Sequence, residues 1–274
     1  LILQARELNK FHGTFLSSIM RYQINGRIHA EINQLRSDQG GTVSGRLSMG
    51  NPNLQQIPAR NKDFGPKIRS LFIPEEGQKW GSFDYSQQEP RMTVHYAASI
   101  GEGYEGSQEL VDAYKNASAD FHQTVADLVG IERTQAKTIG LGLMYGMGKN
   151  KLANSLGLTK DEAEILISKY NRKVPFVKLL SEKCMLTAQD KGVIRTKRGR
   201  KCRFDQWETK DFGLHLPETF DNAVAKYGRD NIKRAKTYKA LNRLIQGSSA
   251  DQTKQAMVDC YKAGHLPILQ IHDE

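Results

Sequence analysis

The chain has 274 residues, of which 38% are hydrophobic and 26% charged, so it can bury a core and is neither disordered nor collagen-like. Forty Lys and Arg against thirty Asp and Glu leave a formal net charge of +10, which favours an anionic partner, nucleic acid before a membrane surface. The three cysteines lie far apart without a Cys-x-x-Cys pair, which excludes a zinc knuckle or a dense disulfide framework and makes the reducing cytoplasm the expected location.

The first hundred residues predict two helices, a loop and several short strands. Residues 1–24 predict the helix, and residues 37–66, rich in Gly, Pro, Ser and Asn, predict a loop with short helical turns. A further helix to about residue 99 is predicted with Pro90 in its first turn, where a missing N–H costs little. Strands are predicted at 27–35, 71–73 and 80–84.

The rest of the chain is predicted to be mostly helical between residues 120 and 245. Thr159 and Glu162 fit a capping box at one helix start. Residues 191–204 predict a hairpin that turns near Gly199, and residues 267–272 predict a short apolar strand. Strands near both ends with helices between them indicate a discontinuous sheet domain that carries a helical lobe.

Both ends of the chain lack the features of a natural terminus. There is no initiating Met, and the last residues are an apolar run followed by two acids. We therefore expect an internal piece of a longer protein. No apolar run reaches the roughly 20 residues needed to span a bilayer, so no membrane partner is expected.

Carboxylates follow two of the predicted strands. Asp84 ends the strand at 80–84, and Asp273 and Glu274 follow the strand at 267–272. If these strands are neighbours, Asp84 and Asp273 meet, and a cation must offset their repulsion. Carboxylate oxygens beside a phosphate substrate favour Mg²⁺, and two such ions can activate a hydroxyl and stabilise a leaving phosphate oxygen. Capping of a turn is the common alternative for an Asp at a strand end, and the pattern leaves it open.

A second candidate site is the helix predicted near residues 132–145. Arg133, Lys137, Leu141 and Tyr145 recur every four residues and share one helix face. Two cations followed by an apolar and an aromatic side chain suit a nucleoside triphosphate laid along the helix. An ordinary amphipathic helix with solvated cations is equally compatible with this spacing.

Six motifs in a fixed order carry a family resemblance. They lie at 44–58 (SGRLS and PNLQQIP), 84–91 (DYSQQEPR), 133–146 (RxxxKxxxxxxxYG), 192–200 (GxxxTxxGR), 246–251 (QGxxAD) and 272–274 (HDE). In this order they resemble the motifs of family A DNA polymerases, the bacterial polymerase I and phage replicase group. The resemblance covers most of the chain, except residues 205–236.

The resemblance implies an α+β fold, in which a right-hand polymerase palm with an antiparallel sheet, truncated after the last motif, carries an inserted and mostly helical fingers domain. The implied domains are the N-terminal part of the palm at 1–95, with any end of the thumb, and the fingers at 96–240. The palm resumes at 241–274. Within the fingers, a basic hairpin lies near 192–204 and an insertion near 205–236.

The implied activity is template-directed DNA synthesis, in replication or repair, which transfers a deoxynucleotide from dNTP to a primer 3′-hydroxyl and releases pyrophosphate. The implied partners are primer-template DNA and dNTPs; a processivity factor is not identifiable. Two Mg²⁺ ions, for which Mn²⁺ can substitute, would be held by Asp84, Asp273 and the Tyr85 carbonyl. Glu274 would be an auxiliary acid, and Lys137 would protonate the leaving group.

Further residues receive binding roles from the same resemblance. Those assigned to the dNTP are Arg133, Lys137, His122, Leu141, Tyr145, Glu89 and Gln87. Glu89 would pack with Tyr145 and exclude a 2′-hydroxyl by a clash. Those assigned to the primer-template are Arg46, Asn53, Gln55, Gln56, Arg60, Gln246 and His272.

The sequence departs from the family pattern at Leu141, where many relatives carry Phe or Tyr, so sugar discrimination is in question. The short link from His122 to Arg133 and the apparent insertion favour a phage or prophage origin, with a location in the bacterial or infected host cytoplasm. Two alternatives remain: a single-subunit RNA polymerase, against which Glu89 argues, and a non-catalytic nucleic-acid binder. Whether the piece is active by itself is a separate question.

Overall fold

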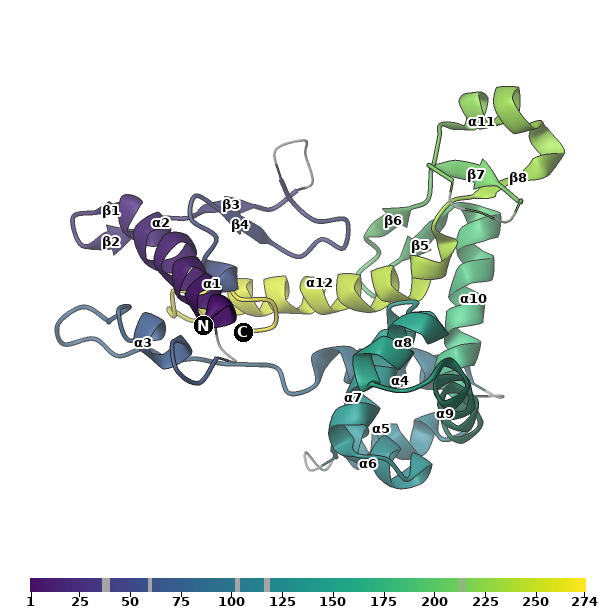
Figure 1. Cartoon of the computed structure of the whole chain (residues 1–274), viewed down its shortest axis with the longest axis horizontal. Helices are drawn as coiled ribbons and strands as arrows, with labels where there is room; N and C mark the ends of the chain where they lie inside the picture. Colours follow the sequence, from purple (N-terminus) through teal and green to yellow (C-terminus); the bar gives the residue numbers. More distant parts are fainter. Residues whose placement is uncertain (36–39, 59–60, 102–103, 116–118, 212, 214) are drawn as a thin grey trace. The chain divides into compact units, whose positions relative to one another are not determined.

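The computed structural model describes residues 1–35, 40–58, 61–101, 104–115, 119–211, 213 and 215–274 (Figure 1). The chain divides into two compact units: unit 1 contains residues 1–85 and 252–274, and unit 2 contains residues 86–251. Both ends of the chain thus belong to one unit, with the other inserted between them. The assignment of these units to palm and fingers, with the expected boundaries after residues 95 and 240, remains a prediction.

Unit 1 begins with a continuous helical segment where a helix was predicted at 1–24, but the helix ends at Arg21 and residues 23–24 form a strand. The helical segment consists of α1 (Ile2–Lys10), a π-helical stretch (Phe11–Ser17) and α2 (Ser18–Arg21). A hairpin of β1 (Gln23–Ile24) and β2 (Arg27–Ile28) follows. Its turn residues Asn25 and Gly26 have φ of 50° and 78°, as a two-residue turn between right-handed twisted strands requires.

The remaining elements of unit 1 are short. β3 (Glu31–Asn33) pairs antiparallel with β4 (Ser48–Gly50), and a 3₁₀ turn (Leu54–Gln56) and α3 (Gly65–Arg69) follow. The single strand predicted at 27–35 is therefore two strands with different partners. The core of this unit comprises Phe11, Phe15, Ile19 and Ile68.

Three predicted strands are absent from the described residues: those at 71–73, 80–84 and 267–272 are irregular backbone or turn. Their apolar residues gain little burial, since Ile73 is 75% and Phe83 84% exposed. A strand is stabilised by its ladder partner and by packing of one face, and an apolar run in the sequence supplies neither. These three predictions were wrong.

Unit 2 is mostly helical. Its first helices are α4 (Gln88–Ile100), α5 (Ser107–Lys115), α6 (Phe121–Val129), α7 (Arg133–Met144), α8 (Lys149–Leu156), α9 (Lys160–Lys173) and α10 (Pro175–Lys191). They enclose one hydrophobic core, which includes Val94, Phe121, Ile139 and Tyr170. Every helix among the described residues of the chain is too short or too polar to cross a bilayer.

Two helix starts in unit 2 follow the sequence prediction. Thr159 and Glu162 form the predicted capping box: the Glu162 N–H donates to Thr159 Oγ1 at 3.3 Å, and the Thr159 N–H donates to Glu162 Oε2 at 2.8 Å. Pro90 lies in the first turn of α4, where its ring replaces an N–H that has no helical acceptor.

The predicted basic hairpin is formed by β5 (Val193–Arg195) and β6 (Lys201–Arg203), with Gly199 in the turn at φ 86°. The segment that follows contains β7 (Trp207–Thr209), α11 (Phe220–Tyr227), a 3₁₀ turn (Arg229–Asn231) and β8 (Ile232–Arg234), with β7 and β8 paired antiparallel. A second 3₁₀ turn (Thr237–Lys239) leads into the long helix α12 (Ala240–Lys262).

The three cysteines differ in exposure. Cys184 and Cys202 are buried, and Cys260 is exposed. Burial raises the pKa of the Cys184 thiol to about 12, and burial is also the main cause of the raised pKa of Cys202. The two buried thiols are therefore protonated at neutral pH.

Candidate active site

The acidic end of the chain forms a tight turn in unit 1. The Ile271 N–H donates to the Glu274 carbonyl at 2.8 Å, and the Glu274 N–H donates back to Ile271 at 3.0 Å. His272, at the head of this turn, has φ 61°. The Tyr85 N–H donates to the Asp273 carbonyl at 3.2 Å. This bond brings the residue after Asp84 against Asp273, so the two distant acidic segments lie side by side.

The negative charges of Asp273 and Glu274 act on Asp84, which lies beside this turn. Asp84 is exposed, yet partial desolvation first, and then the negative charges of Asp273 and Glu274, raise its pKa. The Ser82 hydroxyl donates to a Glu274 carboxylate oxygen. The structure thus brings the three predicted acids together, within electrostatic range of one another, on irregular backbone.

The donor set of this acidic turn fits a hard divalent cation. Carboxylate and carbonyl oxygens are the ligands that Mg²⁺ prefers, and a cation would offset the negative charges of Asp273 and Glu274 that, after desolvation, raise the Asp84 pKa. Among the described residues, no three or more His, Cys, Asp or Glu side chains are grouped in a way that could hold a metal ion. The acids are therefore near one another without forming a closed ligand cage.

Gln55 joins the acidic turn to the first motif. Its side-chain amide donates to the Leu47 carbonyl and to the Gln270 carbonyl, both at 3.3 Å, and Gln270 is only 6% exposed. Gln270 in turn donates to the His272 carbonyl. Gln55, predicted to touch DNA, is thus engaged with protein backbone beside the acids.

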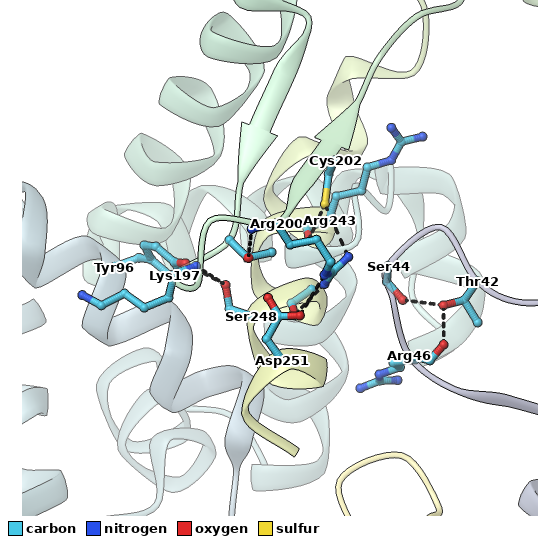
Figure 2. Close-up of polar contacts among 12 residues, drawn as sticks. Thr42, Ser44, Arg46, Tyr96, Lys197, Arg200, Cys202, Arg243, Ser248 and Asp251 are labelled. Atoms are coloured by element: carbon cyan, nitrogen blue, oxygen red, sulfur yellow. Dashed lines mark hydrogen bonds and ion pairs between the residues drawn. The ribbon is translucent and has the colours of Figure 1, made fainter. Parts of the chain in front are cut away.

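Of the other predicted primer-template residues of unit 1, the structure describes Arg46, Asn53, Gln56 and His272. Asn53 caps the 3₁₀ turn, since its side chain accepts from the Gln55 N–H at 3.1 Å. Gln56 and His272 are exposed, and Arg46 is half-buried. The Arg46 carbonyl accepts from the Thr42 hydroxyl at 2.9 Å (Figure 2). Arg60 lies outside the described residues.

Helix α7 of unit 2 carries the four residues that were predicted to share one helix face, which we call the α7 stripe. Arg133 is its first residue, Lys137 is exposed, Leu141 is half-buried against the core, and Tyr145 follows the last turn at 38% exposure. Gly146, with φ 72°, ends the helix; an added Cβ there would lie 3.0 Å from the Tyr238 ring. The helix therefore ends where that ring approaches its backbone.

The first residue of α7 is paired with the cap of α6. Arg133 donates from Nε at 2.8 Å and from Nη2 at 2.6 Å to one carboxylate oxygen of Asp120. The other oxygen of Asp120 accepts from the backbone N–H groups of His122 and Gln123, at 2.9 and 3.1 Å. Sequence reasoning missed this ion pair. The sequence feature that could have indicated it is Asp120, an N-cap residue thirteen positions before Arg133.

His122 lies within unit 2 beside these charges. It is 4% exposed, and its Nδ1 has no hydrogen-bond partner among the described residues. Burial lowers its pKa; Lys137 and Arg133 lower it further, against the opposing charge of Asp120. A neutral imidazole with an unpartnered nitrogen can serve as a hydrogen-bond acceptor or donor.

The far end of the stripe is tied to α4. The Tyr145 hydroxyl donates to a carboxylate oxygen of Glu89, which is 8% exposed. The structure thus brings together the two residues predicted to lie beneath the sugar. Near the start of α4, Gln87 accepts from the Phe121 N–H at 2.9 Å and donates to the Ala119 carbonyl at 3.2 Å. The carbonyl and the amino group of the Gln87 side chain, predicted to bind dNTP, are therefore both hydrogen-bonded to protein backbone.

The basic hairpin is fastened to α12 next to Gln246, which is half-buried. Arg200 donates from Nε to Asp251 at 2.8 Å and from Nη2 to the Gly247 carbonyl at 2.7 Å (Figure 2). Ser248 accepts from the Lys197 N–H at 3.3 Å. The GxxxTxxGR and QGxxAD motifs therefore meet, and Arg200 has a structural contact instead of a free surface charge.

The comparisons with known proteins place these motifs in one family. The family model described as DNA polymerase family A matches residues 1–274. The chain belongs to DNA polymerase family A. The resemblance inferred from the six motifs is therefore confirmed, as is the α+β fold class of mixed helices and small antiparallel sheets.

Individual family A proteins show the same relationship. The chain is 39% identical to a DNA-directed DNA polymerase of Pseudomonas phage M6, across 100% of the chain and 45% of that protein. It is 31% identical to the thermostable DNA polymerase I of Thermus aquaticus, across 100% of the chain and 31% of that protein. The chain thus spans less than half of the length of these relatives.

A solved family A structure has the same fold. It is the POL domain of Pol1 from M. smegmatis in complex with DNA primer-template and dNTP, with a TM-score of 0.72 at 27% identity. The match covers 99% of this chain and 44% of that one. Members from a phage and from bacteria are therefore similar to this chain along its whole length.

Proposed function

We propose that the chain contributes the palm, as unit 1, and the fingers, as unit 2, of a polymerase that copies a DNA template. The reaction joins the primer 3′-hydroxyl oxygen to the α-phosphorus of a dNTP and releases pyrophosphate. Family membership along residues 1–274 is the observation that carries this proposal. The acidic turn and the α7 stripe supply the side chains that such a reaction needs.

The proposed nucleotide site uses the α7 stripe in order. Arg133 and His122 bind the outer phosphates, and Lys137 contacts the phosphates and gives a proton to the departing pyrophosphate. Leu141 and Tyr145 lie against the sugar and base, above Glu89. The Glu89–Tyr145 bond supports the sugar end, and the Asp120–Arg133 pair supports the phosphate end.

The proposed cation site is the acidic turn, with Asp84, Asp273 and the Tyr85 carbonyl as ligands and Glu274 beside them. Mg²⁺ bound there would lower the pKa of the primer hydroxyl and offset charge on the phosphates. The oxygen-only donor set supports this assignment, as does the raised pKa of Asp84, which results from desolvation first and then from the charges of Asp273 and Glu274. The proposed DNA contacts are Arg46, Asn53, Gln55, Gln56, Arg60, Gln246 and His272.

Primer extension tests the proposed function. The product of the gene that carries this sequence should add the nucleotide specified by the template to a primer, with dNTPs and Mg²⁺. A product that binds primer-template DNA but adds no nucleotide would favour the non-catalytic binder. Preferential use of rNTPs would favour the RNA polymerase alternative.

Glu89→Ala should weaken the rejection of ribonucleotides. Removing the carboxylate leaves room for a 2′-hydroxyl, so the ratio of rNTP to dNTP incorporation should rise by about 10- to 200-fold, as expected for a steric difference in one pocket. Single-nucleotide kcat/KM values with dCTP and CTP measure it. The control is Tyr145→Phe, which keeps the ring and removes only the hydroxyl that bonds Glu89. An unchanged ratio in Glu89→Ala would contradict the assignment.

Leu141→Phe and Leu141→Tyr should change discrimination between deoxy- and dideoxynucleotides. A ring at this half-buried position of α7 would pack on the incoming sugar, where Leu offers less contact. The measurement is the kcat/KM ratio for dNTP against ddNTP in each protein. Identical ratios in all three proteins would show that this position does not touch the sugar.

A further inference from the structure

The carboxylate of Asp120 performs two tasks with its two oxygens. Oδ1 accepts from the N–H groups of His122 and Gln123 and so caps α6. Oδ2 accepts both Nε–H and Nη2–H from Arg133, the first residue of α7. One side chain therefore fixes the start of the helix that bears His122 and also restrains the guanidinium of Arg133.

Asp120 is itself held from both sides. Gln87 accepts from the Phe121 N–H and donates to the Ala119 carbonyl, so the backbone on each side of Asp120 is fixed to the start of α4. An exposed ion pair usually contributes little because both side chains remain mobile. Here one partner is fixed by its cap and by Gln87, so the pair restrains mainly the orientation of Arg133.

The Arg133 guanidinium keeps donors for a second acceptor. It has five N–H groups, of which Asp120 engages two, and its side chain is 46% exposed. Burial acts to raise the Asp120 pKa, but the bonds from Arg133, Gln123 and His122 outweigh it and hold that pKa below its usual value. Asp120 is thus an anion at neutral pH, and Arg133 has a charged anchor on one edge only.

We propose that Asp120 is a positioning residue for the triphosphate: it presents the free edge of Arg133 to the outer phosphates next to His122. This inference rests on the proposed function and assigns the residue that organises its phosphate end. It acts through Arg133, so its effect should appear in nucleotide affinity and vanish when Arg133 is absent.

Asp120→Ser separates the two tasks of Asp120, because Ser is a good N-cap but cannot anchor a guanidinium by charge. The KM for dNTP should rise by about 2- to 12-fold, the size expected when one long side chain must be ordered on binding. The kcat should change less than about twofold, because the reacting groups are untouched. Asp120→Asn, which also lacks the charge, should shift KM in the same direction.

Two controls make this test specific. Asp127→Asn removes one negative charge from an exposed position of the same helix, where Asp127 accepts a hydrogen bond from Gln123 rather than from Arg133, and should leave KM unchanged. In an Arg133→Ala background, Asp120→Ser should add nothing to the loss already caused by Arg133→Ala. The inference would be overturned if the KM increases caused by Asp120→Ser and Arg133→Ala multiplied in the double variant. It would also be overturned if the KM of Asp120→Ser were unchanged or lower.

Direct binding of dATP with Mg²⁺, measured by calorimetry, separates this inference from the proposed function. A protein that binds dATP but extends no primer would refute DNA synthesis. The inference would then be supported if Asp120→Ser weakened dATP binding while Asp127→Asn did not. It would be overturned if both variants bound dATP like the unmodified protein.

Discussion

Asp84→Asn and Asp273→Asn should each reduce primer extension by at least about a thousandfold, because each change removes several kcal/mol of charge stabilisation from the proposed cation site. Binding of primer-template DNA, measured at one fixed salt concentration, should stay nearly the same, because the basic surface is unaltered. Chelation with EDTA should stop synthesis by the unmodified protein, and added Mg²⁺ or Mn²⁺ should restore it.

The fold of Asp84→Asn should remain intact. The pKa of Asp84 is raised by desolvation and by the charges of Asp273 and Glu274, so the neutral Asn relieves repulsion at neutral pH. The thermal unfolding midpoint should therefore be unchanged or higher. Glu76→Gln, an exposed carboxylate change in unit 1, serves as the matched control and should keep full activity. Synthesis that survives at a tenth of the normal rate in either Asp variant would refute the two-acid assignment.

Lys137→Ala should lower kcat for single-nucleotide addition by about 10²- to 10⁴-fold, the usual contribution of a general acid in a transition state. Lys137 is exposed on the α7 face between Arg133 and Leu141, so the loss should arise from chemistry and phosphate contact, with the helix retained. Rapid-quench measurements with saturating dNTP isolate that step.

The control for Lys137 is Lys151→Ala, an exposed lysine on α8 of the same unit. It removes the same charge from unit 2 without touching the stripe, and its kcat should match that of the unmodified protein. A kcat within threefold of normal in Lys137→Ala would exclude it as the proton donor.

Local signals in the sequence were the most reliable. The capping box at Thr159, the first-turn Pro90 and the hairpin around Gly199 were all predicted and observed, because each depends on a few adjacent residues. The strands predicted at 80–84 and 267–272 were wrong, because a strand depends on a partner elsewhere in the chain. The acids at the ends of these segments still lie close together through one backbone bond and a tight turn.

Contacts between side chains that are distant in the sequence could not be predicted from the sequence pattern. An N-cap role for Asp120 can be read from the residues that follow it, but its pairing with Arg133 depends on how α6 and α7 pack. Gln87 lies in the DYSQQEPR motif and was assigned to the nucleotide; nothing in the sequence indicated that its amide also bonds to the backbone at Ala119 and Phe121. Such hydrogen bonds depend on how distant segments pack, which motif membership does not predict.

The distribution of thiols offers a practical route to these measurements. Because Cys184 and Cys202 are buried and protonated while Cys260 on α12 is exposed, a maleimide dye should react at one position of this chain without prior mutagenesis. Stoichiometry near one dye per chain, and its loss in Cys260→Ser, would verify that selectivity. A fluorophore at that position would give a single-site spectroscopic reporter.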